Sequence, residues 1–167
     1  MAKRNYEEGD WFAVPLRNGG YALGVVARLD GKGGIIGYFF GPKYYAPPSL
    51  DEVTDKTASN AILVSNFGDL GLRRGKWKRV GKAPRWDRNQ WPIPPFVRTD
   101  AVSGVHRKAI YTEDNLNTER ALLPCNLVEA ATLPRDGIAG YGAVEIKLTK
   151  LLSNQTDSCD TTLHFRI

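Results

Sequence analysis

The first forty residues contain three short runs in which apolar and polar positions alternate. The runs cover residues 10–16, 21–29 and 35–40, and an Asn-Gly pair at 18–19 and a glycine-rich turn at 30–34 separate them. Side chains that alternate with a period of two lie on opposite faces of a strand, and Asn-Gly accepts the positive φ angles of a tight hairpin. The pattern therefore predicts an N-terminal antiparallel β-meander.

The second run has one face made of small residues. Ala22, Gly24 and Val26 share this face, which ends in Arg28. Small side chains at alternate positions of a strand leave room for another backbone or a large side chain to approach closely. We expect such an approach at this strand.

Shorter apolar runs predict further strands at residues 61–67, 77–80 and 108–112. Residues 84–95 contain four prolines, which predict an extended or looped connection and not a helix. Sixteen per cent of the chain, roughly, is glycine or proline, a share typical of many turns and short strands.

The end of the chain changes to a helical period. Apolar residues such as Val144, Leu148 and Leu152 recur every three or four positions and predict one late helix at about 138–152. A polar loop at 153–160 and a last strand at 162–167 are expected after it. The predicted fold class is α+β and predominantly β, with a strongly bent or barrel-like sheet.

The composition supports one globular domain over residues 1–167. The hydrophobic fraction of 42% and the charged fraction of 25% are close to those of ordinary globular proteins, which argues against disorder. The first residues run into acids without an apolar segment, and the longest apolar stretch, 35–40, is too short to cross a bilayer. These features predict a cytoplasmic protein that does not enter the membrane.

The positive charge is concentrated in one segment. The chain has a formal net charge of +5, but residues 71–98 hold nine basic residues and one acidic residue, so the rest of the chain carries a net charge of −3. The nine are Arg73, Arg74, Lys76, Lys78, Arg79, Lys82, Arg85, Arg88 and Arg98. Such a local field favours an acidic partner, either a protein or a nucleic acid.

Three of the four tryptophans lie in the same segment, at Trp77, Trp86 and Trp91. Arginine beside tryptophan is typical of a protein-binding surface, and it is equally typical of a platform that stacks nucleic-acid bases. Tryptophans are also well buried on average. We interpret Trp77 and Trp91 as structural and leave both roles open for Trp86.

The residues offer no recognisable catalytic or metal-binding arrangement. The two histidines, His106 and His164, have no cysteine or carboxylate neighbour at metal-ligand spacing, and no nucleophile motif is present. Cys125 has no basic neighbour, and its pairing with Cys159 stays open. We therefore expect a protein that is not an enzyme and that uses no cofactor or metal.

Three blocks of the chain together resemble the immunity protein 26 family of bacterial polymorphic-toxin systems. The first is GDWFAVPL at 9–16 followed by YALGVV at 21–26, and the second leads from GKW at 75–77 to WPIPPF at 91–96. The third is GYGAVE at 140–145 with Leu148. The resemblance extends over about residues 7–152.

This resemblance implies a cytoplasmic binder that protects its own cell by blocking the active site or substrate path of a cognate toxin. The family motifs are expected to form the framework, whereas the basic run corresponds to no family signature. We therefore predict that the toxin contacts are made by Arg73, Arg74, Arg79, Arg85, Trp86 and Arg88, against an acidic toxin surface. The alternative is a nucleic-acid-binding module that uses the same segment, 71–98.

Overall fold

The computed structural model describes residues 4–163, with side chains through residue 153. The larger of its two antiparallel sheets has the strand order β4-β3-β2-β1-β5. Its strands are β1 (Asp10–Pro15), β2 (Tyr21–Leu29), β3 (Gly34–Tyr44), β4 (Leu63–Gly68) and β5 (Lys78–Lys82). The predicted N-terminal meander is confirmed as β1 to β3, and the predicted strands at 61–67 and 77–80 correspond to β4 and β5. The sheet is open, because β4 and β5 lie at opposite edges.

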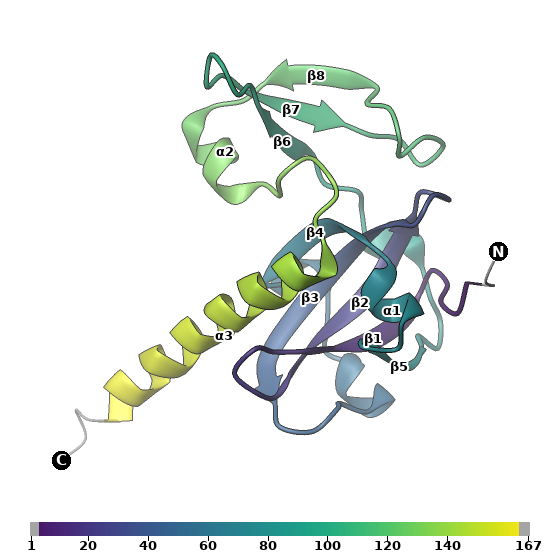
Figure 1. Ribbon diagram of the computed structural model, residues 1–167, viewed down its shortest axis with the longest axis vertical. Helices are drawn as coiled ribbons and strands as arrows, with labels where there is room; N and C mark the ends of the chain where they lie inside the picture. Colours follow the sequence, from purple (N-terminus) through teal and green to yellow (C-terminus); the bar gives the residue numbers. More distant parts are fainter. Residues whose placement is uncertain (1–3, 164–167) are drawn as a thin grey trace.

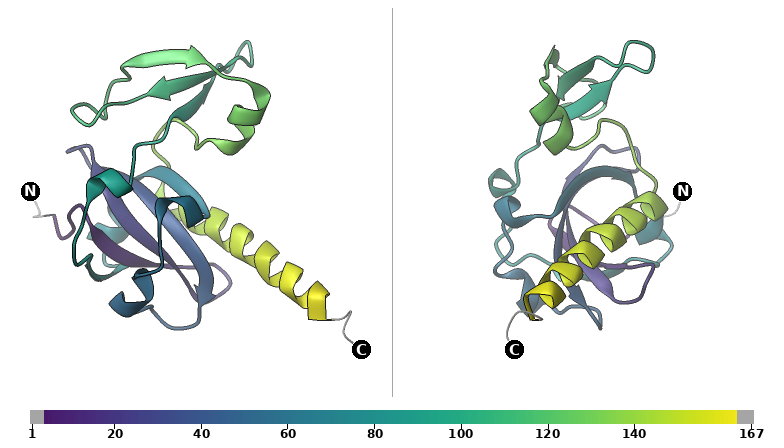
Figure 2. Two further views of the ribbon diagram at one scale, coloured as in Figure 1. Left: turned by 180° about the vertical axis from the view of Figure 1, so that it is seen from behind. Right: turned by 90° about the vertical axis from the view of Figure 1, so that its left-hand side faces the viewer.

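A smaller sheet forms a second lobe beyond one end of the first sheet (Figures 1 and 2). It has the order β6-β7-β8, with strands at Phe96–Thr99, His106–Ile110 and Ala121–Pro124. The predicted strand at 108–112 corresponds to β7. The eight strands of the described residues confirm the predominantly β class, although the sequence pattern had not indicated β6 or β8.

Helices are few in the described part of the chain. α1 (Leu70–Arg73) and α2 (Leu127–Thr132) are short, and α3 (Tyr141–Leu163) lies across one face of the larger sheet (Figure 1). Three 3-10 turns, η1, η2 and η3, complete the elements, at Leu50–Val53, Ala58–Asn60 and Arg88–Gln90. The last of these corrects the expectation that 84–95 contains no helical turn; it fits between prolines, and the Asp87 side chain accepts a hydrogen bond from the Asn89 amide at its start.

The late helix is confirmed, but its bounds differ from those predicted. It begins at Tyr141, not at 138, and it continues to Leu163. The polar loop expected at 153–160 is wrong, because these residues belong to the helix; neither glycine nor proline occurs among them to end it. The last strand expected at 162–167 is wrong for its first two residues, which are helical, and its remainder lies outside the described residues.

The larger sheet buries apolar side chains on both faces. One face carries Phe12, Phe39, Phe67 and Trp77 beneath Leu148 of α3. The other face is covered by the 3-10 turns and the proline-rich connection, and its core consists of Trp11, Leu23, Val25, Ala27, Tyr38, Phe40, Val53 and Trp91. Because both faces are covered, β1, β2 and the first part of β3 are nearly continuously buried, whereas the edge strands β4 and β5 are only partly buried or exposed.

An irregularity in β2 redirects its last side chains. The register against β3 shifts between Val26 and Arg28, as at a β-bulge. Leu29 consequently packs with the cluster that contains Val26, whereas Arg28 points to the loop around residue 88. The simple alternation predicted for 21–29 therefore holds through Ala27 and fails at Arg28 and Leu29.

The small face of β2 receives an aromatic ring, as expected from its sequence. A Cβ atom at Gly24 would lie 2.5 Å from Cε2 of Phe12 and 3.1 Å from Cδ1 of Phe39. Both phenylalanines are fully buried, so neither ring can move aside without disturbing the core.

We expect Gly24→Ala to lower the free energy of unfolding by about 2 kcal/mol, as is typical when a packed core is overfilled. Gly68→Ala in β4 is the matched control, because the nearest atom to its added Cβ is 3.9 Å away. Urea denaturation of both variants measures the difference. Equal stability of the two variants would contradict close packing at Gly24.

Candidate functional site

The basic segment follows the edge of the larger sheet. α1 ends at Arg73, a turn at Gly75 with a φ of 72° reverses the chain, and β5 then forms the edge strand beside β1. Arg73, Arg74, Lys76, Lys78, Arg79, Lys82, Arg85 and Arg88 are all exposed. The edge therefore carries a dense row of cations, which also protects an edge strand against unwanted pairing.

The first cations of the row lie close to the start of α3. The Arg73 guanidinium is 3.7 Å from the Asp69 carboxylate, and Nζ of Lys76 donates a hydrogen bond of 3.0 Å to the Tyr141 hydroxyl. The hydrogen bond from Lys76 lowers the pKa of the Tyr141 hydroxyl, and Arg74 contributes in the same direction. Arg73, Arg74 and Lys76 thus share one end of the sheet.

Acidic residues of the N-terminal segment neutralise the next part of the row. Arg79 donates to the buried Asp10 carboxylate over 2.8 Å, and Nζ of Lys82 lies 3.0 Å from Glu7. The hydrogen bond from Lys82 lowers the pKa of the Glu7 carboxyl. Part of the positive charge that the sequence places in 71–98 is therefore compensated within the protein.

The three tryptophans occupy different environments. Trp77 is 1% exposed on the α3 side, where its Nε1 donates to Oε2 of Glu145 over 2.9 Å. Trp91 is buried on the opposite face. Trp86 is half-buried and stacks on Trp91, with ring centroids 5.9 Å apart and an interplanar angle of 12°. The structural interpretation of Trp77 and Trp91 agrees with this burial.

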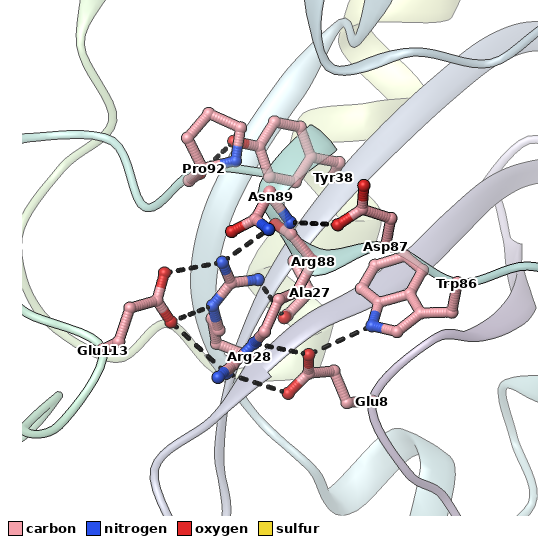
Figure 3. A network of polar contacts seen from close by, with 10 residues as sticks. All are labelled: Glu8, Ala27, Arg28, Tyr38, Trp86, Asp87, Arg88, Asn89, Pro92 and Glu113. Carbon is pink, nitrogen blue, oxygen red and sulfur yellow. Dashed lines mark hydrogen bonds and ion pairs between the residues drawn. The ribbon is translucent and has the colours of Figure 1, made fainter.

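Arg88 belongs to a polar network that joins the two lobes (Figure 3). Its guanidinium pairs with Glu8 at 2.9 Å and with Glu113 at 3.3 Å, and Trp86 Nε1 also donates to Glu8. At the centre, the 1% exposed side chain of Arg28 donates two hydrogen bonds to the Glu113 carboxylate, at 2.6 and 2.7 Å. The hydrogen bond from Arg28 lowers the pKa of the Glu113 carboxyl.

The structure thus divides the six predicted contact residues into three groups. Arg73 and Arg74 lie near the start of α3, and Arg79 lies against the N-terminal segment. Arg85, Trp86 and Arg88 lie in the connection after β5, on the face that contains Trp91. The six therefore do not form one continuous patch: the pair Arg73 and Arg74, the single Arg79 and the trio after β5 have different surroundings.

Four cations of the segment have no carboxylate partner among the described residues. They are Arg74, Lys76, Lys78 and Arg85. Arg98, by contrast, pairs with Glu119 and Asp136 in the smaller lobe. An acidic surface would therefore meet uncompensated charge mainly at the turn after α1 and at Arg85.

Sequence reasoning missed a set of exposed apolar residues in the smaller lobe. Leu122 and Leu123 of β8 and Leu127 and Val128 of α2 are exposed by 37%, 43%, 78% and 73%. Backbone hydrogen bonds with 134–136 cover the outer edge of β6, whereas β8 is paired only with β7 in the described residues. No alternation in the sequence distinguishes this short strand.

None of the helices in the described part of the chain is long and apolar enough to span a membrane. The described residues also contain no group of three or more histidine, cysteine or acidic side chains placed to hold a metal ion.

Comparison with known proteins identifies the family of this chain. The sequence model of the family described as Immunity protein 26 matches residues 7–108, which is more than half of the chain. The first two of the three resembling blocks lie inside this range, and the third, at 140–145, lies beyond it. No curated protein and no solved structure matches the chain.

Proposed function

The chain belongs to the immunity protein 26 family, and on that premise we propose that it binds a cognate bacterial toxin in the cytoplasm and neutralises it by covering the toxin's active site or substrate path. In this proposal the protein acts by binding and performs no catalysis of its own. The toxin meets it through the exposed cations of the α1–β5 edge and the connection that follows.

The observation that supports this contact surface is the set of exposed cations that lack a carboxylate partner. Arg74 and Arg85 are uncompensated, and Arg73 is only loosely held by Asp69 at 3.7 Å. Exposed charges of one sign accelerate the encounter with an oppositely charged surface, and arginine then pairs with carboxylates through two hydrogen bonds. Arg79, Trp86 and Arg88 also contact the toxin in this proposal. Their side chains are already held in position by Asp10, in the case of Arg79, and by Glu8.

The burial of the tryptophans favours a protein partner over a nucleic acid. A platform for single-stranded nucleic acid stacks bases on exposed aromatic rings. Trp77 and Trp91 are buried, and Trp86 is stacked on Trp91. The alternative of nucleic-acid binding therefore depends on the cations alone.

Charge reversal at the start of the row tests the proposal. We expect Arg73→Glu combined with Arg74→Glu to slow association with the toxin encoded next to this gene by about tenfold or more at low salt, because steering is lost. The difference should shrink at high salt, where exposed charges are screened. Stopped-flow or surface-based binding kinetics measure both rates.

Lys43→Glu combined with Lys150→Glu is the matched control, with the same change in net charge at exposed or half-buried positions on β3 and α3. A wild-type protein that neither binds the toxin nor rescues cells from it contradicts the proposal. Tight, steeply salt-dependent binding to DNA or RNA in place of the toxin supports the alternative, because phosphate contacts release counterions.

A further inference from the structure

A hollow on the second face of the sheet lies beside the proposed contact residues. Its volume is about 390 Å³, and its apolar walls are Trp11, Trp86, Trp91, Val53, Ala83 and Pro84. Trp11 meets the ring of Trp91 edge to face at 5.8 Å, and Trp86 stacks on the same ring. We call this site the tryptophan hollow. Three indoles give it rigid apolar walls of the kind that ligand sites use.

Two cations line the tryptophan hollow without firm partners. The side chain of Lys56 is only 8% exposed, and among the described residues it forms an ion pair only with the exposed Asp55, at 3.5 Å. Arg85 has no carboxylate partner among the described residues. Asp87 also lines the hollow, but its carboxylate accepts a hydrogen bond from the Asn89 amide and is directed toward that residue (Figure 3).

One tryptophan of the wall carries a buried polar atom that lacks a partner. Trp11 is 2% exposed, and its Nε1 is the only buried side-chain nitrogen or oxygen among the described residues without a hydrogen-bond partner. Buried donors are nearly always satisfied, so an orphan N–H needs an explanation. Because this nitrogen is itself buried, it lies behind the surface of the hollow that a ligand would contact.

The backbone at the rim is strained. Arg85 has a φ of 87°, and it is the only residue other than glycine in the described chain with a positive φ. Such conformations cluster at binding sites, where the surrounding structure holds a side chain in a required position. Here the conformation belongs to a rim cation with no internal partner.

From these observations we propose that the tryptophan hollow receives an acidic side chain of the toxin, carried beside an apolar residue. Lys56 and Arg85 pair with the carboxylate, while Trp86 and Trp91 contact the apolar neighbour. This inference rests on the proposed function and assigns a specific receptor site to it. It adds to the contact residues Lys56, which the sequence did not indicate, and Trp91, which the sequence indicated only as structural.

The test compares the affinity of the wild-type protein for the toxin with that of a double variant, Lys56→Met combined with Arg85→Gln. Methionine keeps an apolar stem in place of the buried lysine, and circular dichroism and thermal unfolding verify that the fold is retained. We expect affinity to fall about 30-fold or more, mainly through faster dissociation, as when one side of a desolvated charge pair is removed. Lys43→Met combined with Arg107→Gln removes the same charge elsewhere and should change affinity less than about threefold.

A charge swap then identifies the occupant. Exposed acids of the toxin are changed one at a time to lysine, and each variant is titrated with the wild type and with Lys56→Glu combined with Arg85→Glu. We expect one toxin variant to lose binding to the wild type and to regain it with the reversed hollow.

The outcomes separate the two proposals. If the wild type binds the toxin tightly and the Lys56→Met, Arg85→Gln protein binds it equally well, the hollow is not a contact and the proposed function stands. If the wild type does not bind the toxin, the proposed function and the inference fail together. Selective loss in the hollow variant, with rescue by the swap, supports both.

Discussion

Trp77→Ala is expected to lower the free energy of unfolding by about 4 kcal/mol, in the range typical of large aromatic residues removed from a core. Trp77 is 1% exposed and stacks on Phe12 with ring centroids 5.5 Å apart and an interplanar angle of 13°. It also contacts Phe67 at 5.3 Å. The substitution removes the indole ring that these two phenylalanines both contact in the core beneath α3. Urea denaturation at neutral pH measures the loss of stability.

A second substitution at the same position separates packing from hydrogen bonding. Trp77→Phe keeps an aromatic ring but removes the indole N–H that donates a hydrogen bond to Glu145. Glu145 is only 7% exposed, and in this variant it keeps its ion pair with Arg17. We expect this variant to lie between the wild type and Trp77→Ala. A loss below about 1 kcal/mol for Trp77→Ala would mean that Trp77 does not organise the core.

Glu113→Gln is expected to lower the free energy of unfolding by about 3 kcal/mol, because the buried guanidinium of Arg28 loses its counter-charge. Arg28 is 1% exposed, and its remaining acceptors are the carbonyl oxygens of Ala27 and Arg88. Asp114→Asn is the control, since it removes one acidic charge from the adjacent exposed position. Thermal or urea unfolding at pH 7 compares the two. Equal losses would show that the ion pair does not stabilise the fold.

The same pair predicts how the difference depends on pH. Arg28 lowers the pKa of Glu113 in the folded protein, so this carboxylate contributes stability that is fully present above the unfolded pKa of about 4.3. The contribution is lost as the pH falls through the folded value. We therefore expect the stability gap between the wild type and Glu113→Gln to narrow below about pH 4, and a constant gap would contradict this origin.

The ion pair between Arg28 and Glu113 also helps to hold the proposed binding surface in place. Glu113 lies in the β7–β8 loop, outside the family match, and it contacts both Arg28 and Arg88, one of the proposed contact residues. Glu8 joins Arg88 to Trp86 (Figure 3). The connection that carries Arg85 and one wall of the tryptophan hollow is therefore anchored to both lobes. Side chains held in this way lose less entropy on binding than free ones.

Much of the fold could be predicted from local pattern. The meander of β1 to β3 follows from alternation and glycine turns, and the late helix follows from the spacing of Val144, Leu148 and Leu152. These features repeat within a few residues, so the chain itself carries them. The end of α3 could not be predicted, because a polar run without glycine or proline reads equally well as a loop or as solvated helix.

The candidate site could be predicted less completely, because the sequence shows the charged residues of the segment but not the distant residues with which they form ion pairs. The segment 71–98 and its family motifs were visible in the sequence, and the match over 7–108 confirms the family. No local signal in the sequence indicated the exposed apolar residues of β8 and α2 or the nearly buried side chain of Lys56. Each depends on which surfaces the rest of the chain covers.

By itself, then, the sequence determined the β-rich class, the family and the presence of a strongly basic segment. Only the tertiary structure decided which of its cations are free. Pairing of β5 with β1 brings Lys82 and Arg79 to the N-terminal acids, and the irregularity after Val26 sends Arg28 to Glu113. The physical reason is that a strand's period is local, whereas its partner and the charges beside it depend on contacts between distant segments.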